Sequence, residues 1–490
     1  MPDYHTEPEF ADVVVVGGGG AGLAAAVSAA TRGMRTVLLE KNAELGGTTR
    51  LAVGSFSAAC TRLQRRAGIA DCVDDFRADM QAFAGDLAGR DNPKLRSLLA
   101  TEAGVTLQWL EDLGVVFAGP FPEPPHRVSR MHNAIPGSHM YVDKLERAAK
   151  RAGVMIQLEA TVDNLVTDGH GAVVGLDYTR NGLRRRLAAR RGVILATGDF
   201  SGNREMRKTF LTPAAVAAIP CNPRSNGDGH RLARQVGAGW RNMDIVFGPH
   251  LRFAPAPKPV WANRLPDWSW LARLGAEYLM RAPSWMLKLL VTPMLLTWMS
   301  PSDRLFKEGA ILVDLDGRRL SAAKPGVSVA ESREATGYII LDERIAGLFM
   351  KYPYFISTAP GIAYAYFSDY ARVRPDIVHR AVTVEELARK IEMPADRLRA
   401  SVEGLGGGVL FALGPVHAVL SKTEGSIAVD EQCRVLKENG EPIDGLYAAG
   451  SAGQGGMPMK GHGLHLAWAM TSGRIAGEMV ARRLIPCSRA

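Results

Sequence analysis

The sequence predicts an α/β fold in which a parallel sheet carries helices on both faces and an α+β cap domain is inserted into the chain. Three observations lead to this prediction. An apolar run at residues 12–16 leads into a glycine turn and an alanine-rich segment that ends at residue 30. A second apolar run, residues 36–39, ends in an acid. The composition then changes between residues 250 and 410, and residues 250–310 alone hold five of the eight tryptophans.

The first two runs have the spacing of a strand–turn–helix–strand unit that binds a dinucleotide. In residues 12–22, Asp-Val-Val-Val-Val-Gly-Gly-Gly-Gly-Ala-Gly, Gly17 allows the tight turn and Gly19 lets the main chain approach a pyrophosphate. Gly22 lets the helix lie close to the strand. Glu40 follows at the distance where an acid accepts hydrogen bonds from a ribose. The unit predicts a Rossmann-like domain.

Further segments indicate that the dinucleotide is FAD. Residues 41–49, Lys-Asn-Ala-Glu-Leu-Gly-Gly-Thr-Thr, place a glycine pair and two hydroxyls where a second loop must cover the FAD pyrophosphate. Residues 192–198 and 445–450 each form a short apolar run that ends in glycine. Residues 463–473 predict a helix whose N-terminus faces the flavin pyrimidine ring, where the helix dipole would stabilise the reduced flavin.

We therefore expect one FAD, held noncovalently because no histidine that could attach it lies beside the glycine pair at 46–47. The expected FAD contacts are Gly17, Gly19, Gly20, Ala21, Gly22, Glu40, Lys41, Gly47, Thr48, Thr49, Gly54, Val162, Ala196, Thr197, Gly198, Gly450, Ser451, Gly463, Leu464 and Leu466.

With these motifs the chain resembles the FAD flavoproteins related to fumarate reductase, succinate dehydrogenase and the 3-ketosteroid dehydrogenases. The resemblance covers nearly the whole length and is strongest over residues 10–60, 190–245 and 425–480. It departs at Ser451, where many relatives have Glu, Asp or Asn. The resemblance implies two-electron chemistry, in which hydride passes between a substrate carbon and the flavin while an acid or base handles the neighbouring proton.

The composition change divides the chain into a first FAD-binding part at 1–249, a cap or substrate domain at 250–410 and a second FAD-binding part at 411–490. Residues 154–158 and 172–176 alternate like strands of an accessory sheet.

Composition predicts an ordinary globular enzyme, with 47% hydrophobic and 22% charged residues. Five scattered cysteines without a Cys-x-x-Cys pair favour a reducing cytoplasm and argue against iron–sulfur clusters, attached haem and structural zinc. The first apolar run is the strand of the FAD fold, so we expect no secretory signal.

The net charge of +9 gathers partly in Arg184–Arg186 and Arg190–Arg191, around a turn at Asn181-Gly182. A solvated hairpin explains these arginines better than a nucleic-acid patch, because no aromatic residues are interleaved with them. We expect no nucleic-acid partner. A basic surface can also attract anionic substrates.

Residues 268–299 are rich in Leu, Met and Trp but are interrupted by charges and prolines. The longest uncharged run, residues 289–302, has 14 residues and is shorter than the roughly 20 needed to span a bilayer. Two interpretations remain open. The segment forms ordinary core or dimer-contact helices, or it lines an apolar substrate channel or contacts a membrane interface. The second implies an apolar substrate and a cytoplasmic protein with peripheral membrane contact.

The cap departs from the fumarate-reductase pattern that the resemblance brings. Residues 317–324, Gly-Arg-Arg-Leu-Ser-Ala-Ala-Lys, lack the Asn-Glu pair of that pattern, and no arginine follows until Arg333. Lys460 stands where relatives have a carboxylate-clamping arginine. These departures weaken the case for a dicarboxylate substrate.

The ketosteroid branch uses tyrosines for proton transfer, and Tyr364 and Tyr366 lie two residues apart in the cap. We therefore expect them to act as acid and base. Packing is the alternative for each. His132 is an expected carbonyl ligand or proton relay, with a structural role as the alternative. Lys460 and His462 precede the expected flavin-facing helix, where a cation would stabilise an enolate or reduced flavin.

The leading prediction is an FAD-dependent oxidoreductase that desaturates the carbon pair beside a carbonyl in a small apolar, cyclic or steroid-like ketone. One alternative is a flavin C=C reductase of an unsaturated carboxylate. Another is an RNA- or protein-binding flavoprotein with structural FAD. The electron acceptor and the oligomeric state are open at this stage.

Overall fold

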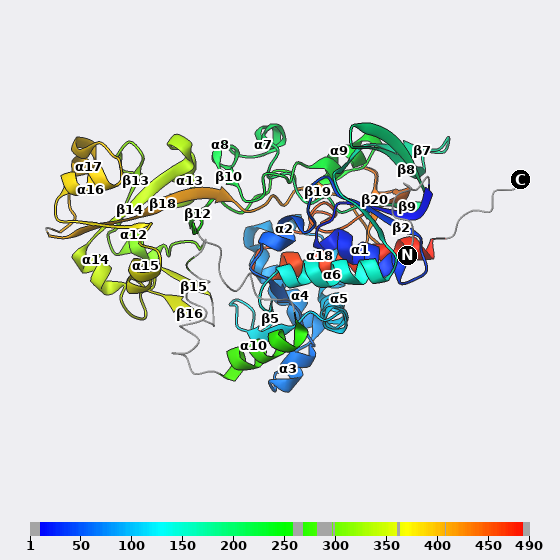
Figure 1. Cartoon of the computed structure of the whole chain (residues 1–490), viewed down its shortest axis with the longest axis horizontal. Helices are drawn as coiled ribbons and strands as arrows, with labels where there is room; N and C mark the ends of the chain where they lie inside the picture. Colours follow the sequence, from blue (N-terminus) through cyan, green and yellow to red (C-terminus); the bar gives the residue numbers. More distant parts are fainter. Residues whose placement is uncertain are drawn as a thin grey trace, which may run out of the picture.

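The computed structural model describes residues 10–257, 268–281, 296, 299–359, 363–406 and 408–483. Figure 1 shows two parts. One is built around a parallel sheet near both chain ends, and the other around a second sheet formed by the middle of the chain.

The first sheet has the strand order β20-β21-β9-β1-β2-β6. β1, β2, β6, β9 and β21 run parallel, and the edge strand β20 is antiparallel to β21. The apolar runs of β1 and β2 are buried on both faces, as expected for a central parallel strand. The strand bounds are β1 Phe10–Val16, β2 Thr36–Leu39, β6 Met155–Gln157, β9 Leu183–Leu195, β20 Arg434–Leu436 and β21 Pro442–Ala448.

Three helices lie together on one side of this sheet: α1 (Gly20–Ala30), α6 (His139–Arg151) and α18 (Leu464–Arg482). α18 continues through Gly473, where the predicted helix ended. A Cβ at Gly473 would overlap the carbonyl oxygen of Ala21, so glycine here allows α18 and α1 to pack closely.

The antiparallel strands β7 (Ala160–Thr167) and β8 (Val173–Arg180) extend from β9 as an accessory sheet. The prediction for residues 172–176 is therefore confirmed, whereas β6 belongs to the parallel sheet and not to the accessory sheet. The arginine-rich hairpin is also present, since β8 and β9 meet at a turn where Asn181 has φ 51°.

The second sheet has the order β10-β18-β14-β13, with β12 and β17 also paired to β18. Its central strand, β18, runs to Leu420, so this sheet extends beyond the predicted boundary at residue 410. The second sheet also includes β10, which lies before the predicted domain boundary at residue 250. The bounds are β10 Ile219–Pro220, β12 His250–Phe253, β13 Ile311–Asp314, β14 Thr336–Asp342, β17 Val378–Ala381 and β18 Leu410–Leu420.

Short helices and a hairpin surround the second sheet (Figure 1). They are α12 Arg304–Lys307, α13 Pro325–Ala330, the 3-10 helix Arg333–Ala335, α14 Glu343–Leu348, α15 Phe367–Val373, α16 Val384–Lys390 and α17 Ala395–Ser401, with the hairpin strands β15 Ser357–Ala359 and β16 Ala363–Ala365. An α+β cap domain was predicted, and this region has that character.

The remaining elements extend the FAD-binding part or connect it to the cap. They are α2 Gly47–Leu51, β3 Ser55–Ser57, α3 Arg62–Arg66, α4 Val73–Ala84, the 3-10 helix Gly85–Arg90, α5 Pro93–Asp112, β4 Phe117–Phe121, β5 Met131–Ala134, α7 Arg204–Phe210, α8 Pro213–Ala217, α9 Asp228–Gln235, β11 Trp240–Arg241, α10 Ser269–Arg281 and β19 Ser426–Ile427. Among the helices that the structure describes, none has the length and apolar character to cross a bilayer.

Candidate active site

A pocket opens at the carboxyl ends of β1, β2 and β9. In open α/β sheets this edge is where nucleotides bind. Most of the residues expected to bind FAD line it: Gly17, Gly19, Gly20, Ala21, Glu40, Lys41, Gly47, Thr48, Thr49, Val162, Ala196, Thr197, Gly198, Gly450 and Ser451. The pocket therefore brings together segments from both ends of the chain.

The glycines of the first turn have the separate roles that the sequence predicts. Gly17 has φ +102°, and a Cβ there would lie 2.5 Å from the carbonyl oxygen of Ala196. A Cβ at Gly22 would overlap the carbonyl oxygen of Gly17. At Gly19 the nearest protein atom to a Cβ is 3.9 Å away, so the protein leaves this side of the main chain open. Such an opening at the start of a helix fits a pyrophosphate.

Glu40 is held at the end of β2 with its carboxylate inside the pocket. The residue is only 6% exposed, and its Oε2 accepts a hydrogen bond from the main-chain N–H of Gly18 at 2.6 Å. Its Oε1 accepts from the main chain and the side chain of Asn42, at 2.9 and 2.6 Å. These bonds orient the carboxylate, and a carboxylate has further lone pairs for a ribose hydroxyl.

The pocket also contains residues that sequence reasoning missed. The Nδ2 of Asn222 donates to the Oγ1 of Thr48 at 2.9 Å, and Lys41 forms an ion pair with Asp228 at 2.7 Å. These contacts tie the glycine loop to the segment before α9. The Asn- and Gly-rich run at 222–229 was the available signal. The missed lining residues are Val16, Leu39, Asn42, Ala160, Thr161, Asn222, Arg224, Ser225, Asp228, Leu232 and Ala469.

Five expected FAD contacts lie outside the pocket: Gly22, Gly54, Gly463, Leu464 and Leu466. Gly22 acts through packing. The carbonyl oxygen of Gly54 accepts bonds from Ala134 and Tyr141, which indicates a structural role. α18 approaches the pocket through Ala469 and not through its first turn, because that turn packs against β3.

Two parts of the chain bring positive charge to one place. β12 carries His250 and Arg252, and the loop before α18 carries Lys460 and His462. Burial lowers the pKa of His250, and the charges of Arg252 and Lys460 lower it further. The charge of Arg252 also lowers the pKa of His462. We call these four residues the cationic cluster, in which Arg252, Lys460 and protonated His462 carry the charge and His250 is neutral at pH 7. Sequence reasoning missed His250 and Arg252 of β12, although residues two apart in a strand lie on the same face.

His462 is bound to a buried carboxylate. The Oε1 of Glu123 lies 2.6 Å from both the main-chain nitrogen and the Nδ1 of His462. This hydrogen bond with Glu123 raises the pKa of His462 despite its partial burial. The imidazole is therefore stabilised in its protonated form, while 64% of its side-chain surface is exposed and can meet a ligand.

A buried network fixes the loop that holds Lys460 and His462. Burial opposes the charge of Glu424, but Lys422 and His465 lower its pKa to about 2. Its carboxylate lies 2.9 Å from the Nζ of Lys422 and 3.1 Å from the Nε2 of His465, and it accepts a bond from the main chain of Met459 at 3.0 Å. The charge network thus determines where the loop before α18 lies.

The structure gives His132 a structural position. The residue has no exposed surface, and its ring nitrogens lie 3.0 Å from the Oγ1 of Thr61 and 3.3 Å from the carbonyl oxygen of Phe56. Burial lowers its pKa to about 4. His132 is therefore neutral and enclosed, and the predicted role as substrate ligand or proton relay is not supported.

Tyr364 lies on β16, and Tyr366 follows this strand. The ring of Tyr364 packs against Phe355 and Tyr352, with ring centroids 5.0 and 5.5 Å apart. Burial raises the pKa of Tyr366, so its phenol stays protonated at neutral pH. Neither tyrosine lines the FAD pocket. The cap residue Arg333 forms an ion pair with Asp316 at 2.9 Å.

The fold and the pocket together define a flavin-dinucleotide-binding α/β protein. Consistent with this class, the model of the FAD binding domain family matches residues 12–258 and 269–462. The chain belongs to this family and is an FAD-dependent oxidoreductase.

Comparison with individual proteins gives the same fold. The chain is 25% identical over 504 residues to the probable fumarate reductase Ifc3 of Shewanella frigidimarina (strain NCIMB 400), covering 97% of this chain and 76% of that protein. The open conformation of a flavocytochrome c3 fumarate reductase superposes with a TM-score of 0.74 at 23% identity, covering 97% of this chain and 78% of the other. The 3-ketosteroid delta1-dehydrogenase from Sterolibacterium denitrificans gives 0.67 at 20% identity, covering 96% and 99%.

Proposed function

We propose that this FAD-dependent oxidoreductase reduces a carbon–carbon double bond that is conjugated to a carboxylate. The observation that carries the proposal is the cationic cluster. Arg252 comes from the sheet of the cap and Lys460 from the loop before α18, and both act on His250, so two parts of the molecule bring positive charge to one place. Carboxylates are the anions that arginine and lysine bind with charge-assisted hydrogen bonds.

The cationic cluster also provides an arginine in place of the one that the fumarate-reductase pattern has in the cap. Arg333 itself is paired with Asp316. Arg252 supplies an arginine from β12 instead, and burial lowers its pKa, as expected for a cation kept partly out of water. A partly desolvated cation interacts more strongly with a bound anion than an exposed one does.

Bound FAD supplies the two-electron hydride chemistry. As a carbon–carbon double bond accepts hydride, negative charge grows on the conjugated carboxylate, and Arg252 and Lys460 stabilise that charge. The adjacent carbon then needs a proton. His462 is the proposed donor, because Glu123 stabilises its protonated form and the ring is exposed.

The proposal is tested by mixing the chemically reduced holoprotein, without oxygen, with unsaturated acids and with their methyl esters. The panel contains fumarate, urocanate and cinnamate. We expect at least one acid to reoxidise the flavin at least about 100-fold faster than its ester, because two charge-assisted hydrogen bonds are each worth about 1.5–3 kcal/mol. Equal rates for acid and ester would rule out recognition of the carboxylate.

Desaturation of an apolar cyclic ketone is the second candidate. It is favoured by the two cap tyrosines and by the likeness to a 3-ketosteroid dehydrogenase over almost the full length of both chains. In this candidate the phenols of Tyr364 and Tyr366 polarise the ketone and move its α-proton. Bleaching of the oxidised flavin by a 3-ketosteroid without oxygen, combined with no reoxidation by any acid of the panel, would favour this candidate over the first.

A further inference from the structure

We propose that α10 and α3 form a surface that docks on an anionic lipid bilayer. This inference concerns the lower edge of the molecule in Figure 1, where α3 and α10 lie, and is independent of the substrate. It deepens the sequence-based expectation of a membrane contact in residues 268–299 by assigning it to particular side chains.

α10 buries one small apolar face and also leaves large apolar side chains exposed, beside the charged residues Arg273, Glu277 and Arg281. On the inner face Ala272 and Ala276 are buried in a small core with Val116 and Met140. The outer face carries large side chains in water: Leu274 is 60% exposed and Met280 is 47% exposed. An outer face of this kind has no role in holding the fold together.

Two tryptophans complete the outer face. Trp268 is 54% exposed and Trp270 is 59% exposed. Their rings stack with centroids 5.9 Å apart and planes at 19°, so they form one flat aromatic surface at the start of α10. Tryptophan has an apolar body and one N–H donor, which suits the boundary between lipid headgroups and acyl chains.

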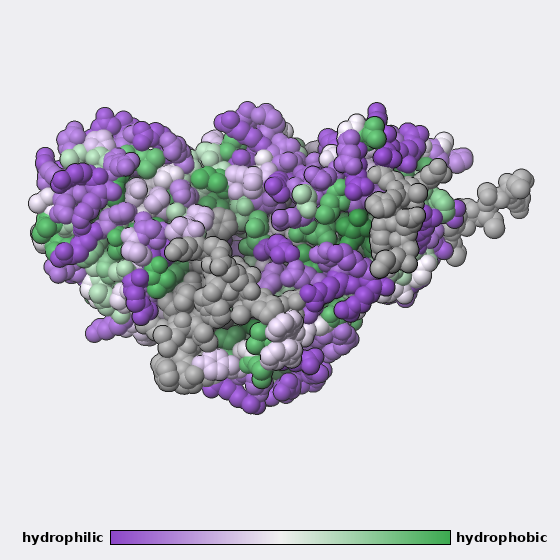
Figure 2. Space-filling view, viewed as in Figure 1, coloured by the Kyte–Doolittle hydropathy of each residue, from purple (hydrophilic) through white to green (hydrophobic). Residues whose placement is uncertain are grey.

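Arginines surround this apolar face. α3 and α10 both pack against β4, and Arg62 of α3 lies 3.6 Å from Glu111. Figure 1 shows α3 and α10 at one end of the molecule, and Figure 2 shows apolar and pale residues there next to a hydrophilic band. The arginines of this surface outnumber its acids: Arg62, Arg65, Arg66, Arg273 and Arg281 against Glu111, Asp112 and Glu277.

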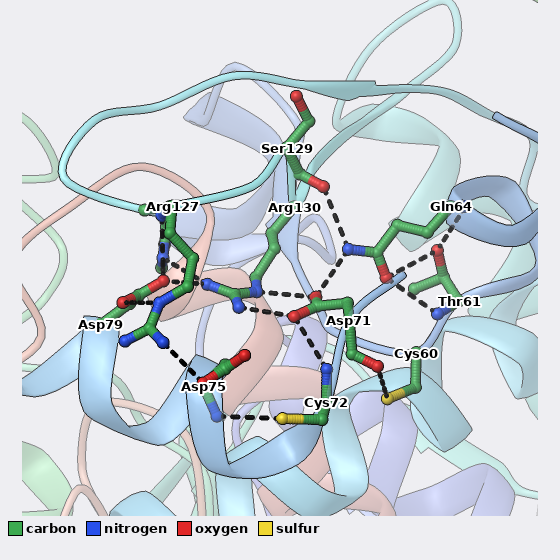
Figure 3. Close-up of polar contacts among 11 residues, drawn as sticks. Cys60, Thr61, Gln64, Asp71, Cys72, Asp75, Asp79, Arg127, Ser129 and Arg130 are labelled. Carbon is green, nitrogen blue, oxygen red and sulfur yellow. Dashed lines mark hydrogen bonds and ion pairs between the residues drawn. The ribbon is translucent and has the colours of Figure 1, made fainter. Parts of the chain in front are cut away.

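α3 is held rigidly, with its arginines outward. Gln64 is fully buried and donates to Asp71 at 2.7 Å and to the carbonyl oxygen of Ser129 at 3.0 Å. Arg130, also without exposed surface, binds Asp71 and Asp79 at 2.5 Å each (Figure 3). This anchoring fixes one face of α3, so the helix itself needs no ordering when its other face binds.

The charges favour a bilayer over a second copy of the chain. A two-fold symmetric contact whose axis passed through the arginines of α3 and α10 would bring like charges together, which is repulsive. An anionic bilayer offers negative headgroups to the arginines and an apolar interior to the tryptophans and leucine.

Vesicle flotation with the FAD-loaded full chain tests the proposal. We expect binding to vesicles of 30% phosphatidylglycerol in phosphatidylcholine, at least tenfold weaker binding to pure phosphatidylcholine, and loss of binding as salt is raised. W270S/L274S should reduce binding at least tenfold, and Arg62→Gln with Arg66→Gln should reduce only the part that depends on anionic lipid. Val382→Ser is the matched control, because Val382 is 64% exposed on the cap.

Binding that is absent, or unchanged in W270S/L274S, would overturn the proposal. A dimer in solution that Leu274→Arg converts to monomer would also overturn it, since the surface would then be a contact between copies. Each variant keeps its bound flavin and its reoxidation rate if it folds, and this check separates the docking result from the proposed chemistry.

Discussion

The pairing of Glu123 with His462 yields the most detailed prediction. Glu123 is 5% exposed, and one of its oxygens lies 2.6 Å from two nitrogens of His462. Glu123→Gln keeps an oxygen for the main-chain bond but removes the charge. A hydrogen bond to a charged group is worth about 1.5–3 kcal/mol. Because the histidine side chain is 64% exposed, solvent screening reduces this to about 1 kcal/mol.

The effect depends on pH in a definite direction. Glu123 raises the pKa of His462, so this pair stabilises the protein fully below the ordinary histidine pKa of 6.5, and the contribution is lost as pH rises through the raised value. Proton donation follows the same course. In Glu123→Gln we expect an unchanged rate at acid pH and a rate about fivefold lower on the alkaline side, where about 1 kcal/mol decides how much imidazole is protonated.

The assay is the rate of flavin reoxidation by the best acid of the panel, measured between pH 5 and 9 with wild type and variant. His462→Gln should remove the pH dependence that belongs to this donor, and adding Glu123→Gln to it should change nothing further. Glu111→Gln is the control, because burial raises the pKa of Glu111 at a distance from the cluster. A Glu123→Gln profile identical to wild type would refute the role of the pair.

Three more predictions follow from the described residues. Gly19→Ala should fold normally, since a Cβ there meets no protein atom closer than 3.9 Å, yet lose FAD at least tenfold, as measured by the ratio of flavin to protein absorbance. Burial lowers the pKa values of His132 and His230 to about 4, so the free energy of unfolding should fall as pH decreases from 6.5 towards 4. His132→Gln should reduce the slope of this pH dependence by up to one proton. A free energy of unfolding that does not change over this range would contradict the burial of these two histidines. Tyr364→Phe and Tyr366→Phe should leave reduction of the acid within about threefold of wild type, whereas a loss of about 10²-fold, the scale of a general acid, would favour the ketone reaction.

The FAD pocket could be predicted from the sequence because its main parts are local. Gly17, Gly19 and Glu40 belong to one strand–turn–helix–strand unit, and their spacing determines their positions whatever the rest of the chain does. Gly198 and Gly450 end parallel strands of the same sheet, so they meet at the same edge.

The cationic cluster could not be predicted in the same way. Arg252 and Lys460 both act on His250 because β12 pairs with β18 and the loop before α18 is fixed by Glu424, and neither fact has a local signal. His132 was misjudged because a histidine in a strand gives no sign of its burial. Gly54 was expected to contact FAD, but it has φ +106° and lies outside the pocket, and the sequence does not show which glycines serve packing.

The most direct test of the central claim combines the substrate pair with Arg252. Reoxidation rates are measured for an unsaturated acid and its methyl ester, in wild type and in Arg252→Gln. If the arginine binds the carboxylate, the variant loses about 10- to 100-fold with the acid, the range of a charge-assisted hydrogen bond, and almost nothing with the ester. An equal loss with both substrates, or no loss with either, would contradict the proposal that this cluster binds the carboxylate of the substrate.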